Sequence, residues 1–186
     1  VMNTYQRAVV DVVRAKSRVK RAFRRYGVAV SGDAVYDPDQ RAEWLAKVSP
    51  NVSFAINVQL ELMDAALKAQ DSLARKLSSM LSKTKEYVLL KEIPGVGPIV
   101  AAIFVAVIDT PSRFDTKRKL WSYAGLGVRV RWSSDPGKAH HGGSRTGNRL
   151  LKYAAMMAAK SATVGKNRFA EHCSKMLADG IPLPMD

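Results

Sequence analysis

A polar, glycine-rich segment at residues 133–149 holds most of the side chains that could do chemistry. Two adjacent serines, Ser133 and Ser134, offer hydroxyl groups that could attack a phosphodiester. A serine in that role needs activation by a base or a metal, and positive groups that stabilise charge on the non-bridging phosphate oxygens. The positive groups are present nearby: Arg129, Arg131, Lys138, Arg145, Arg149 and Lys152. A solvated surface loop is the alternative for a segment of this composition.

Groups that could activate the serines are scarcer. The adjacent pair His140-His141 could act as base or general acid, although such a pair is more often part of a polar loop. Asp135 alone makes a poor magnesium site, because Mg²⁺ usually takes one or two carboxylates together with substrate oxygens. The lone Cys173 excludes an internal disulfide framework and a cysteine-based zinc site. We therefore predict no metal site within this chain.

The charge distribution favours a polyanionic partner. The net charge is +14, and residues 1–27 hold eight Lys/Arg against one acidic residue. Residues 111–160 hold eleven against two, while residues 28–110 hold eight against ten. Two basic blocks flank a nearly neutral middle, which favours nucleic acid over a membrane surface. No apolar run is long enough to span a bilayer, and we expect a cytoplasmic protein that associates with the nucleoid.

The candidate site needs elements that hold it against a phosphate backbone. The sequence Ile93-Pro94-Gly95-Val96-Gly97-Pro98 predicts a tight turn between helices near 84–93 and 98–108. Gly95 and Gly97 permit positive φ and a close backbone approach, and Pro98 suits the first turn of a helix. This pattern is typical of a helix-hairpin-helix element, which grips nucleic acid without reading bases. An ordinary turn between two core helices is the alternative.

The elements that follow the turn are mostly helical. We expect Asp115 to cap a basic helix at 116–124, in which Lys117, Arg118 and Lys119 are further candidates for nucleic-acid binding. Residues 127–132 alternate valine and arginine, as in a short strand. We expect 133–147 to form a loop, followed by helices near 148–163, where an anion could also bind at the N-terminus, and 166–179.

The N-terminal part carries two heptad patterns. Apolar residues recur at alternating spacings of four and three from Tyr5 to Tyr26 and again from Ile56 to Leu81. Each pattern has one polar interruption, Lys16 or Gln70, which we expect to fix the register. We predict a mainly α protein, with a long helical hairpin at 1–83 and a compact helix-hairpin-helix domain at 84–186. One half of an intermolecular coiled coil, or two amphipathic helices on an ordinary core, are the alternatives for the first part.

Five short blocks, in this order and spacing, resemble the C-terminal transposase domain of the Piv/MooV-like insertion-sequence transposases (insertion-sequence family one-hundred-ten). They are Ile93–Pro98, Arg113-Phe114, Trp121–Leu126, Ser133-Ser134 and Gly143–Leu151. The resemblance covers about residues 85–180. The heptad helices before it resemble the linker that separates an N-terminal RuvC-like domain from the transposase domain.

The resemblance implies a DNA transposase or site-specific recombinase in which a serine forms a covalent phosphoserine with DNA. The family serine usually precedes a glycine, whereas in this chain two residues separate Ser134 from Gly137. We favour Ser134 over Ser133 as the nucleophile. The resemblance also implies a structured guide RNA and Mg²⁺ held by the RuvC-like domain, which we expect to lie outside this chain. We expect the chain to be a fragment that is inactive alone.

Three expectations remain open at this point. The heptads suggest a homo-oligomer, a dimer or higher. A non-enzymatic helix-hairpin-helix module that binds DNA or RNA is the alternative to an enzyme. A dimerisation scaffold is a third possibility, which the blockwise distribution of charge disfavours.

Overall fold

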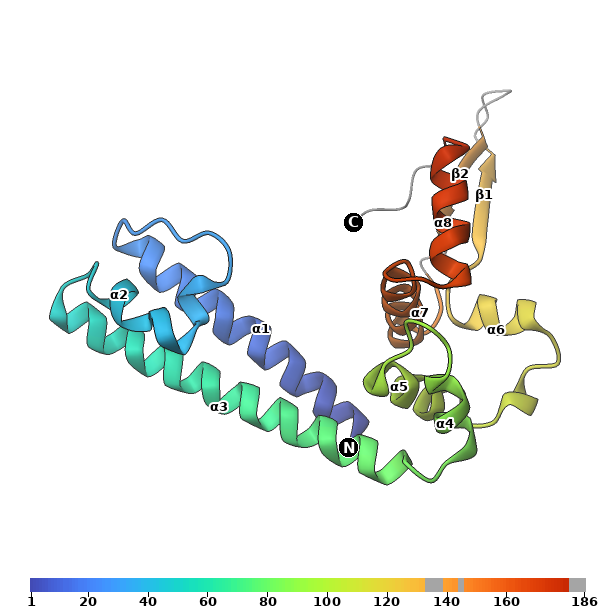
Figure 1. Ribbon diagram of the computed structural model, residues 1–186, viewed down its shortest axis with the longest axis horizontal. Helices are drawn as coiled ribbons and strands as arrows, with labels where there is room; N and C mark the ends of the chain where they lie inside the picture. Colours follow the sequence, from blue (N-terminus) through green and yellow to red (C-terminus); the bar gives the residue numbers. More distant parts are fainter. Residues whose placement is uncertain (133–138, 144–145, 181–186) are drawn as a thin grey trace. The chain divides into compact units, whose positions relative to one another are not determined.

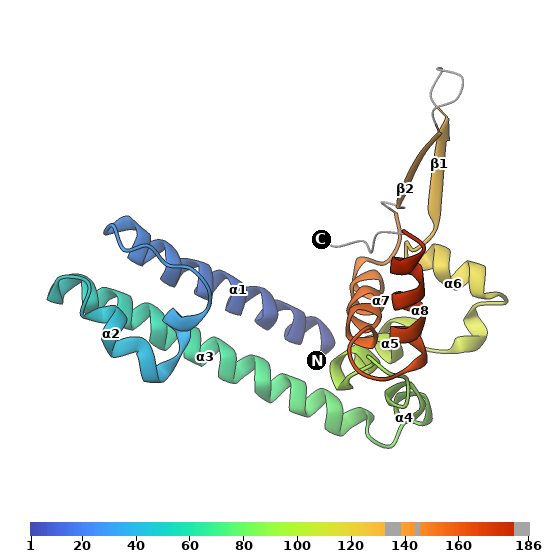
Figure 2. The same cartoon turned by 45° about the horizontal axis from the view of Figure 1, so that its top comes forward.

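A computed structural model describes residues 1–132, 139–143 and 146–180. The chain divides into two compact units, residues 1–77 and residues 78 onward. Helices dominate both units (Figures 1 and 2), which confirms the mainly α class. The helices are α1 (Met2–Arg25), α2 (Arg41–Leu45), α3 (Pro50–Leu81), α4 (Lys85–Lys91), α5 (Pro98–Ile108), α6 (Lys117–Tyr123), α7 (Arg149–Ala162) and α8 (Arg168–Ala178). Two strands, β1 (Val128–Trp132) and β2 (Ala139–Gly143), form an antiparallel pair.

The first unit is a helical hairpin in which α1 and α3 lie side by side (Figure 1). Its core joins side chains from both helices with two valines of the connection between them, and the central members are Val19, Phe23, Val30, Val35, Ile56, Leu60 and Met63. The ring of Trp44 in α2 meets Phe23 edge to face, with ring centroids 6.0 Å apart. The predicted hairpin is therefore an intramolecular one.

The heptad pattern predicts most of the buried positions but not the central one on α1. Tyr5, Val12, Val19 and Phe23 are buried as expected, whereas Ala15 occupies the inner position assigned to Lys16. Burying the Lys16 ammonium would be costly, and its long side chain instead reaches the connection after α1, where it meets Asp33 and Tyr36. The expectation that Lys16 fixes the register between the two long helices is therefore wrong.

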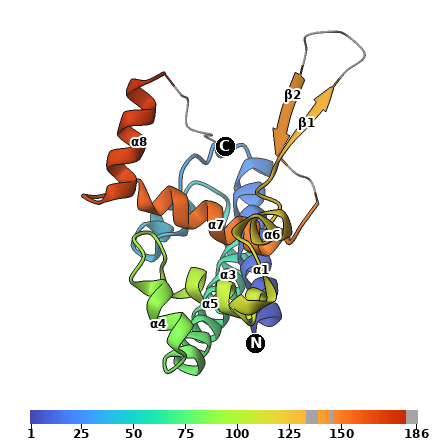
Figure 3. The same ribbon diagram turned by 90° about the vertical axis from the view of Figure 1, so that its right-hand side faces the viewer.

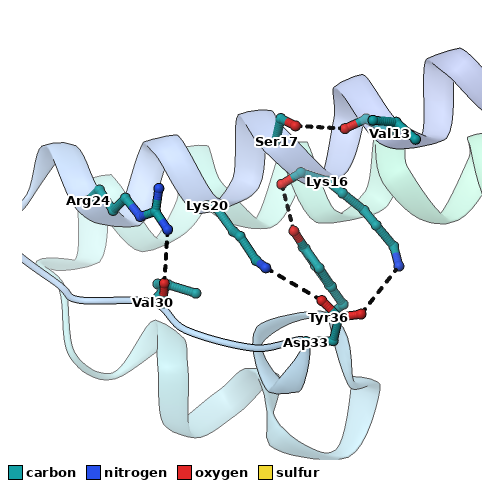
Figure 4. Close-up of polar contacts among 8 residues, drawn as sticks. All are labelled: Val13, Lys16, Ser17, Lys20, Arg24, Val30, Asp33 and Tyr36. Atoms are coloured by element: carbon teal, nitrogen blue, oxygen red, sulfur yellow. Dashed lines mark hydrogen bonds and ion pairs between the residues drawn. The ribbon is translucent and has the colours of Figure 1, made fainter. Parts of the chain in front are cut away.

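The connection between α1 and α2 is held on α1 by Tyr36 (Figure 4). The Tyr36 hydroxyl donates to the Lys16 carbonyl oxygen at 3.0 Å. The ammonium groups of Lys16 and Lys20 lie 4.8 Å and 5.1 Å from the centre of the Tyr36 ring. Both also face Asp33, with N–O distances of 4.0 Å and 3.4 Å. Burial raises the pKa of Tyr36 above its ordinary value, so the phenol stays protonated and keeps donating.

A bidentate ion pair joins α2 to α3. The two terminal nitrogens of Arg41 donate to the carboxylate of Asp64 at 2.6 Å and 2.7 Å. One of them also donates to the Tyr36 carbonyl oxygen at 3.0 Å. The hydrogen bonds to Asp64 raise the pKa of Arg41 further above its ordinary value. The ion pair therefore ties the connection, α2 and α3 into one structure.

Replacement of Asp64 by alanine should lower the free energy of unfolding of this unit by about 1–3 kcal/mol. The Arg41 side chain is only 17% exposed, so the substitution leaves a mostly buried guanidinium without its partner. Asp71→Ala is the matched control, because the Arg75–Asp71 pair on the same helix is 72% and 65% exposed and should contribute at most about 1 kcal/mol. Urea unfolding followed by circular dichroism tests this, and equal effects of the two variants would contradict it.

The second unit is built around α5 and α7. Helix α5 packs against both α4 and α7, and α5 and α7 bury small side chains: Ala101, Ala102, Ala154 and Ala162. Two sequence expectations fail in this unit. Residues 139–143 form β2 instead of a loop, and the cap of α6 is Thr116, whose hydroxyl accepts from the Lys119 amide at 3.3 Å. Asp115 instead forms an ion pair with the Lys119 side chain.

Candidate nucleic-acid interface

The turn between α4 and α5 depends on Gly95. Its φ is +87°, a conformation that favours glycine. A methyl group at this position would lie 2.2 Å from the Ala158 carbonyl oxygen and 2.6 Å from the Ala162 amide nitrogen. Gly95 therefore brings the turn into backbone contact with the end of α7. The sequence predicted a close backbone approach at Gly95, and the structure shows that its neighbour is the backbone of α7.

Gly97 differs from Gly95 in both conformation and surroundings. Its φ is −76° and its ψ is 173°, which any residue can adopt. It is exposed, and a methyl group there would meet nothing within 4 Å. Its carbonyl accepts from the Ala101 amide at 2.9 Å, and no side chain caps the start of α5. The start of α5 thus has backbone amides that no side chain caps, an arrangement that suits an anion.

A second pair of glycines joins the end of α6 to the start of α7, and we call this pair the glycine clasp. It consists of Gly125, with φ +68°, and Gly147, with φ +120°. A methyl group on Gly147 would lie 2.6 Å from the Gly125 amide nitrogen and 2.9 Å from the Tyr123 carbonyl oxygen. The Asn148 amide donates to that same carbonyl at 2.7 Å. The clasp therefore closes residues 126–146 into one loop with a fixed base.

The hairpin of β1 and β2 extends from this base (Figure 3). Arg129 is the register partner of Gly142, and Arg131 is the register partner of His140. The histidine pair thus belongs to a strand that pairs with the arginine-bearing strand. Strand pairing therefore places the backbones of the candidate arginines next to those of the candidate histidines. Their separation in sequence did not indicate this.

An aromatic cluster supports the clasp from the side of α6. The Phe114 and Tyr123 rings are 5.3 Å apart, and the Arg113 guanidinium lies 4.9 Å from the centre of the Tyr123 ring. Tyr123 also provides the carbonyl that accepts from Asn148. The motif blocks around Arg113, Tyr123 and Gly147 therefore meet at one place. Tyr123 positions the start of α7 through its backbone carbonyl, a role that the identity of its side chain did not indicate.

The start of α7 is capped by Asn148. Asn148 accepts with its side-chain oxygen from the amides of Leu150 and Leu151, at 3.1 Å and 3.0 Å. This cap uses two of the amides that were expected to bind an anion. The positive charge that remains to attract an anion at the start of α7 is that of Arg149, which is exposed, and Lys152, which is half-buried.

The structure places the other predicted site residues as follows. Lys117, Arg118 and Lys119 are exposed at the start of α6. Lys119 pairs with Asp115, and the Lys117 ammonium lies 5.7 Å from the Trp121 ring centre, so Arg118 is the most open of the three. Ser133, Ser134, Lys138 and Arg145 lie outside the described residues.

An apolar groove of about 390 Å³ lies between α4, α5 and α6. Its lining is dominated by Leu89, Leu90, Ile93, Phe104, Val105 and Ile108. Such a lining suits an apolar surface and gives no site for a phosphate, so we keep the groove separate from the nucleic-acid interface.

Among the described residues, no three His, Cys, Asp or Glu side chains gather as metal ligands would. In the same part of the chain, no helix is both long enough and apolar enough to cross a membrane.

The motif blocks resemble those of a transposase domain, and the comparison with known families agrees. Residues 87–173 match the family model described as "Transposase IS116/IS110/IS902 family", and this part of the chain belongs to that family. Over 145 residues the chain is 33% identical to the "Mini-circle putative transposase for IS117" of Streptomyces coelicolor. The alignment covers 71% of this chain and 34% of the relative, so the chain spans about a third of that curated relative. The resemblance drawn from the motifs is confirmed.

Proposed function

We propose that this chain is the nucleic-acid-gripping and serine-bearing part of a DNA transposase. The observation that carries the proposal is the glycine clasp, which fixes both ends of the 126–146 segment beside Arg149. In the proposed step, the hydroxyl oxygen of Ser134 or Ser133 bonds to a DNA phosphorus. The serine hydroxyl gives up its proton, the bond from that phosphorus to one deoxyribose oxygen breaks, and the leaving oxygen takes up a proton. The phosphoserine ester replaces one phosphoester bond by another of similar energy, so the reverse reaction can join DNA strands.

Several cationic and amide groups of the second unit support a role in gripping the DNA backbone. The start of α5 offers backbone amides that no side chain caps, and Arg118 and Arg149 offer exposed guanidinium groups. These contacts read phosphates and not bases, so they position the duplex without selecting a sequence. Target choice would come from another partner, and the resemblance implies a structured guide RNA.

The complete activity requires more than this chain. Mg²⁺ would be held by the RuvC-like domain that the resemblance implies, and the roles proposed for this chain's own residues do not depend on it. Strand exchange between two duplexes needs more than one nucleophile, which supports a homo-oligomer. The chain by itself is proposed to bind DNA without cleaving it.

The rival function is a non-enzymatic module that binds DNA or RNA structure. The observation in its favour is that Gly95 makes its close approach to α7, so the turn has a structural role that needs no chemistry. Such a module has no use for two serines between arginine-rich segments, which is why we place it second.

Charge reversal at Arg145 and Arg149 should weaken binding of the chain to duplex DNA at low salt. The wild-type chain should show a salt dependence that corresponds to about 4–8 neutralised phosphates, and the double variant to Glu should lower that number by about two. Lys160→Glu with Lys175→Glu is the control, because both lysines are exposed in the last turns of α7 and α8. Fluorescence anisotropy across a salt series measures this. Equal slopes for the double variant and the wild type would remove these arginines from the interface.

A further inference from the structure

The outward face of α1 carries a row of arginines that the proposed site does not use. We call this row the arginine stripe, and its members are Arg7, Arg14, Arg18, Arg21 and Arg25. All five are exposed. At about 100° per residue they fall within roughly 60° of arc, and at 1.5 Å per residue the row is about 27 Å long. A row this narrow and this long matches a linear array of negative charge.

The cationic residues of α1 fall into two groups, those with partners inside the folded unit and those without. Lys16 and Lys20 are engaged with Asp33 and Tyr36, and Arg24 donates to the Val30 carbonyl oxygen at 3.1 Å (Figure 4). Within the described part of the chain, by contrast, four members of the stripe make no hydrogen bond, ion pair or ring contact: Arg7, Arg18, Arg21 and Arg25. Arg14 meets Asp11 at 3.8 Å, with both side chains more than 60% exposed, where a pair contributes little.

This concentration of like charge works against the stability of the helix. Like charges three or four residues apart on a helix repel by a few tenths of a kcal/mol per pair, and an ordinary surface intersperses both signs. Asp11 is the one acidic residue in α1. The stripe therefore has no role in the folded unit that the described contacts reveal, and its chemistry points to an external polyanion.

The type of the residues in the arginine stripe and their surroundings indicate which class of polyanion it would bind. Guanidinium groups bind phosphate oxygens in a bidentate manner. Insertion into a lipid surface would need an apolar helix face, but that face of α1 is buried against α3 through Val19 and Phe23. Single-stranded nucleic acid is usually held by aromatic side chains between the cations, and none of the exposed residues of α1 from Arg7 to Arg25 is aromatic. A duplex backbone fits these features best.

We propose that the arginine stripe binds the phosphate backbone of duplex DNA, as a contact surface separate from the transposase domain. The major groove of B-form DNA is wide enough to admit a helix, whereas the major groove of A-form RNA is too narrow. The stripe would span most of one helical turn of the duplex. This inference rests on the proposed function, which identifies the polyanion as DNA. Its residues, however, belong to the first unit and not to the transposase domain.

The test compares duplex binding by the wild-type chain and four variants of it across a salt series. Arg14, Arg18 and Arg21→Gln removes the centre of the stripe. Lys68, Arg75 and Lys76→Gln is the matched control on exposed positions of α3, and Lys117, Arg118 and Lys119→Gln probes the second unit. Glutamine has nearly the helix propensity of arginine, so all versions should fold alike by circular dichroism. The probes are a random-sequence DNA duplex and an RNA duplex of the same sequence.

We expect the stripe variant to bind the DNA duplex at least about tenfold more weakly at low salt, with a salt slope smaller by about 2–3, and the α3 control to match the wild type. Arg14, Arg18 and Arg21→Lys should keep most of the wild-type slope. A stripe variant that behaves like the α3 control overturns the inference. A larger loss on the RNA duplex than on the DNA duplex overturns the assignment to DNA. The variant of the second unit reports on the proposed function separately, since its loss without loss in the stripe variant leaves that function standing.

Discussion

Replacement of Gly147 by alanine should unfold the second unit or come close to it. The φ of +120° is one that L-residues rarely adopt, which costs about 1–3 kcal/mol. The added methyl group would also lie within 3 Å of three backbone atoms of Tyr123 and Gly125, and overpacking of that kind costs a further 1–3 kcal/mol or so. A loss of about 3 kcal/mol should lower the melting temperature by roughly 12–24 °C. Differential scanning calorimetry of the whole chain measures it.

Two other glycines separate strain from steric overlap. Gly165 has φ +93° with nothing within 4 Å of an added methyl group, so Gly165→Ala should show the cost of strain alone. Gly127 has no positive φ and open space around it, so Gly127→Ala should leave the melting temperature nearly unchanged. Equal effects of Gly147→Ala and Gly127→Ala would show that the clasp does not hold the unit together.

Loss of the nucleophilic serine should abolish covalent attachment of DNA to the full-length transposase while leaving DNA binding intact. Alanine cannot form the phosphoester, and removal of one hydroxyl does not change the charge that holds the duplex. We expect Ser134→Ala to lose the adduct, and Ser133→Ala to be the informative comparison. Labelled DNA that stays with the protein on a denaturing gel reports the adduct, and anisotropy on the same preparations reports binding.

The comparison between the two serines decides the assignment. Loss of the adduct in Ser134→Ala alone supports Ser134 as the nucleophile, and loss in Ser133→Ala alone moves the nucleophile by one residue. Adduct formation in both single variants would refute a nucleophile at either position and would favour the non-enzymatic module.

The long helices could be predicted because their signals are local. The apolar spacing from Tyr5 to Tyr26 predicts a helix that the structure has at Met2–Arg25. The pair Gly97-Pro98 predicts the start of α5, which is observed at Pro98–Ile108. In both cases the period of the apolar residues and the residues that begin or end a helix agree. The family motifs were also readable, because they depend on residue order alone.

The contacts that organise the site could not be predicted, because they join residues far apart in sequence. Strand β2 consists of Ala139–Gly143, a segment rich in glycine and histidine that has little strand propensity of its own, and its pairing with β1 determines it. The two glycines of the clasp each signal only a turn, and nothing local shows that they touch. Two neighbouring residues competed to cap α6, and the hydroxyl of Thr116 does so while Asp115 pairs with Lys119.

The clasp also bears on how this segment can change during evolution. The backbone contact between Gly125 and Gly147 holds the two ends of the intervening chain together. The entropic cost of closing this loop therefore depends on its length and not on its sequence. Loop entropy grows only with the logarithm of length, about 0.6 kcal/mol for a doubling. The two extra residues Asp135 and Pro136 are thus a small perturbation for the domain. Members of the family could vary the length of this segment without rebuilding α6 and α7.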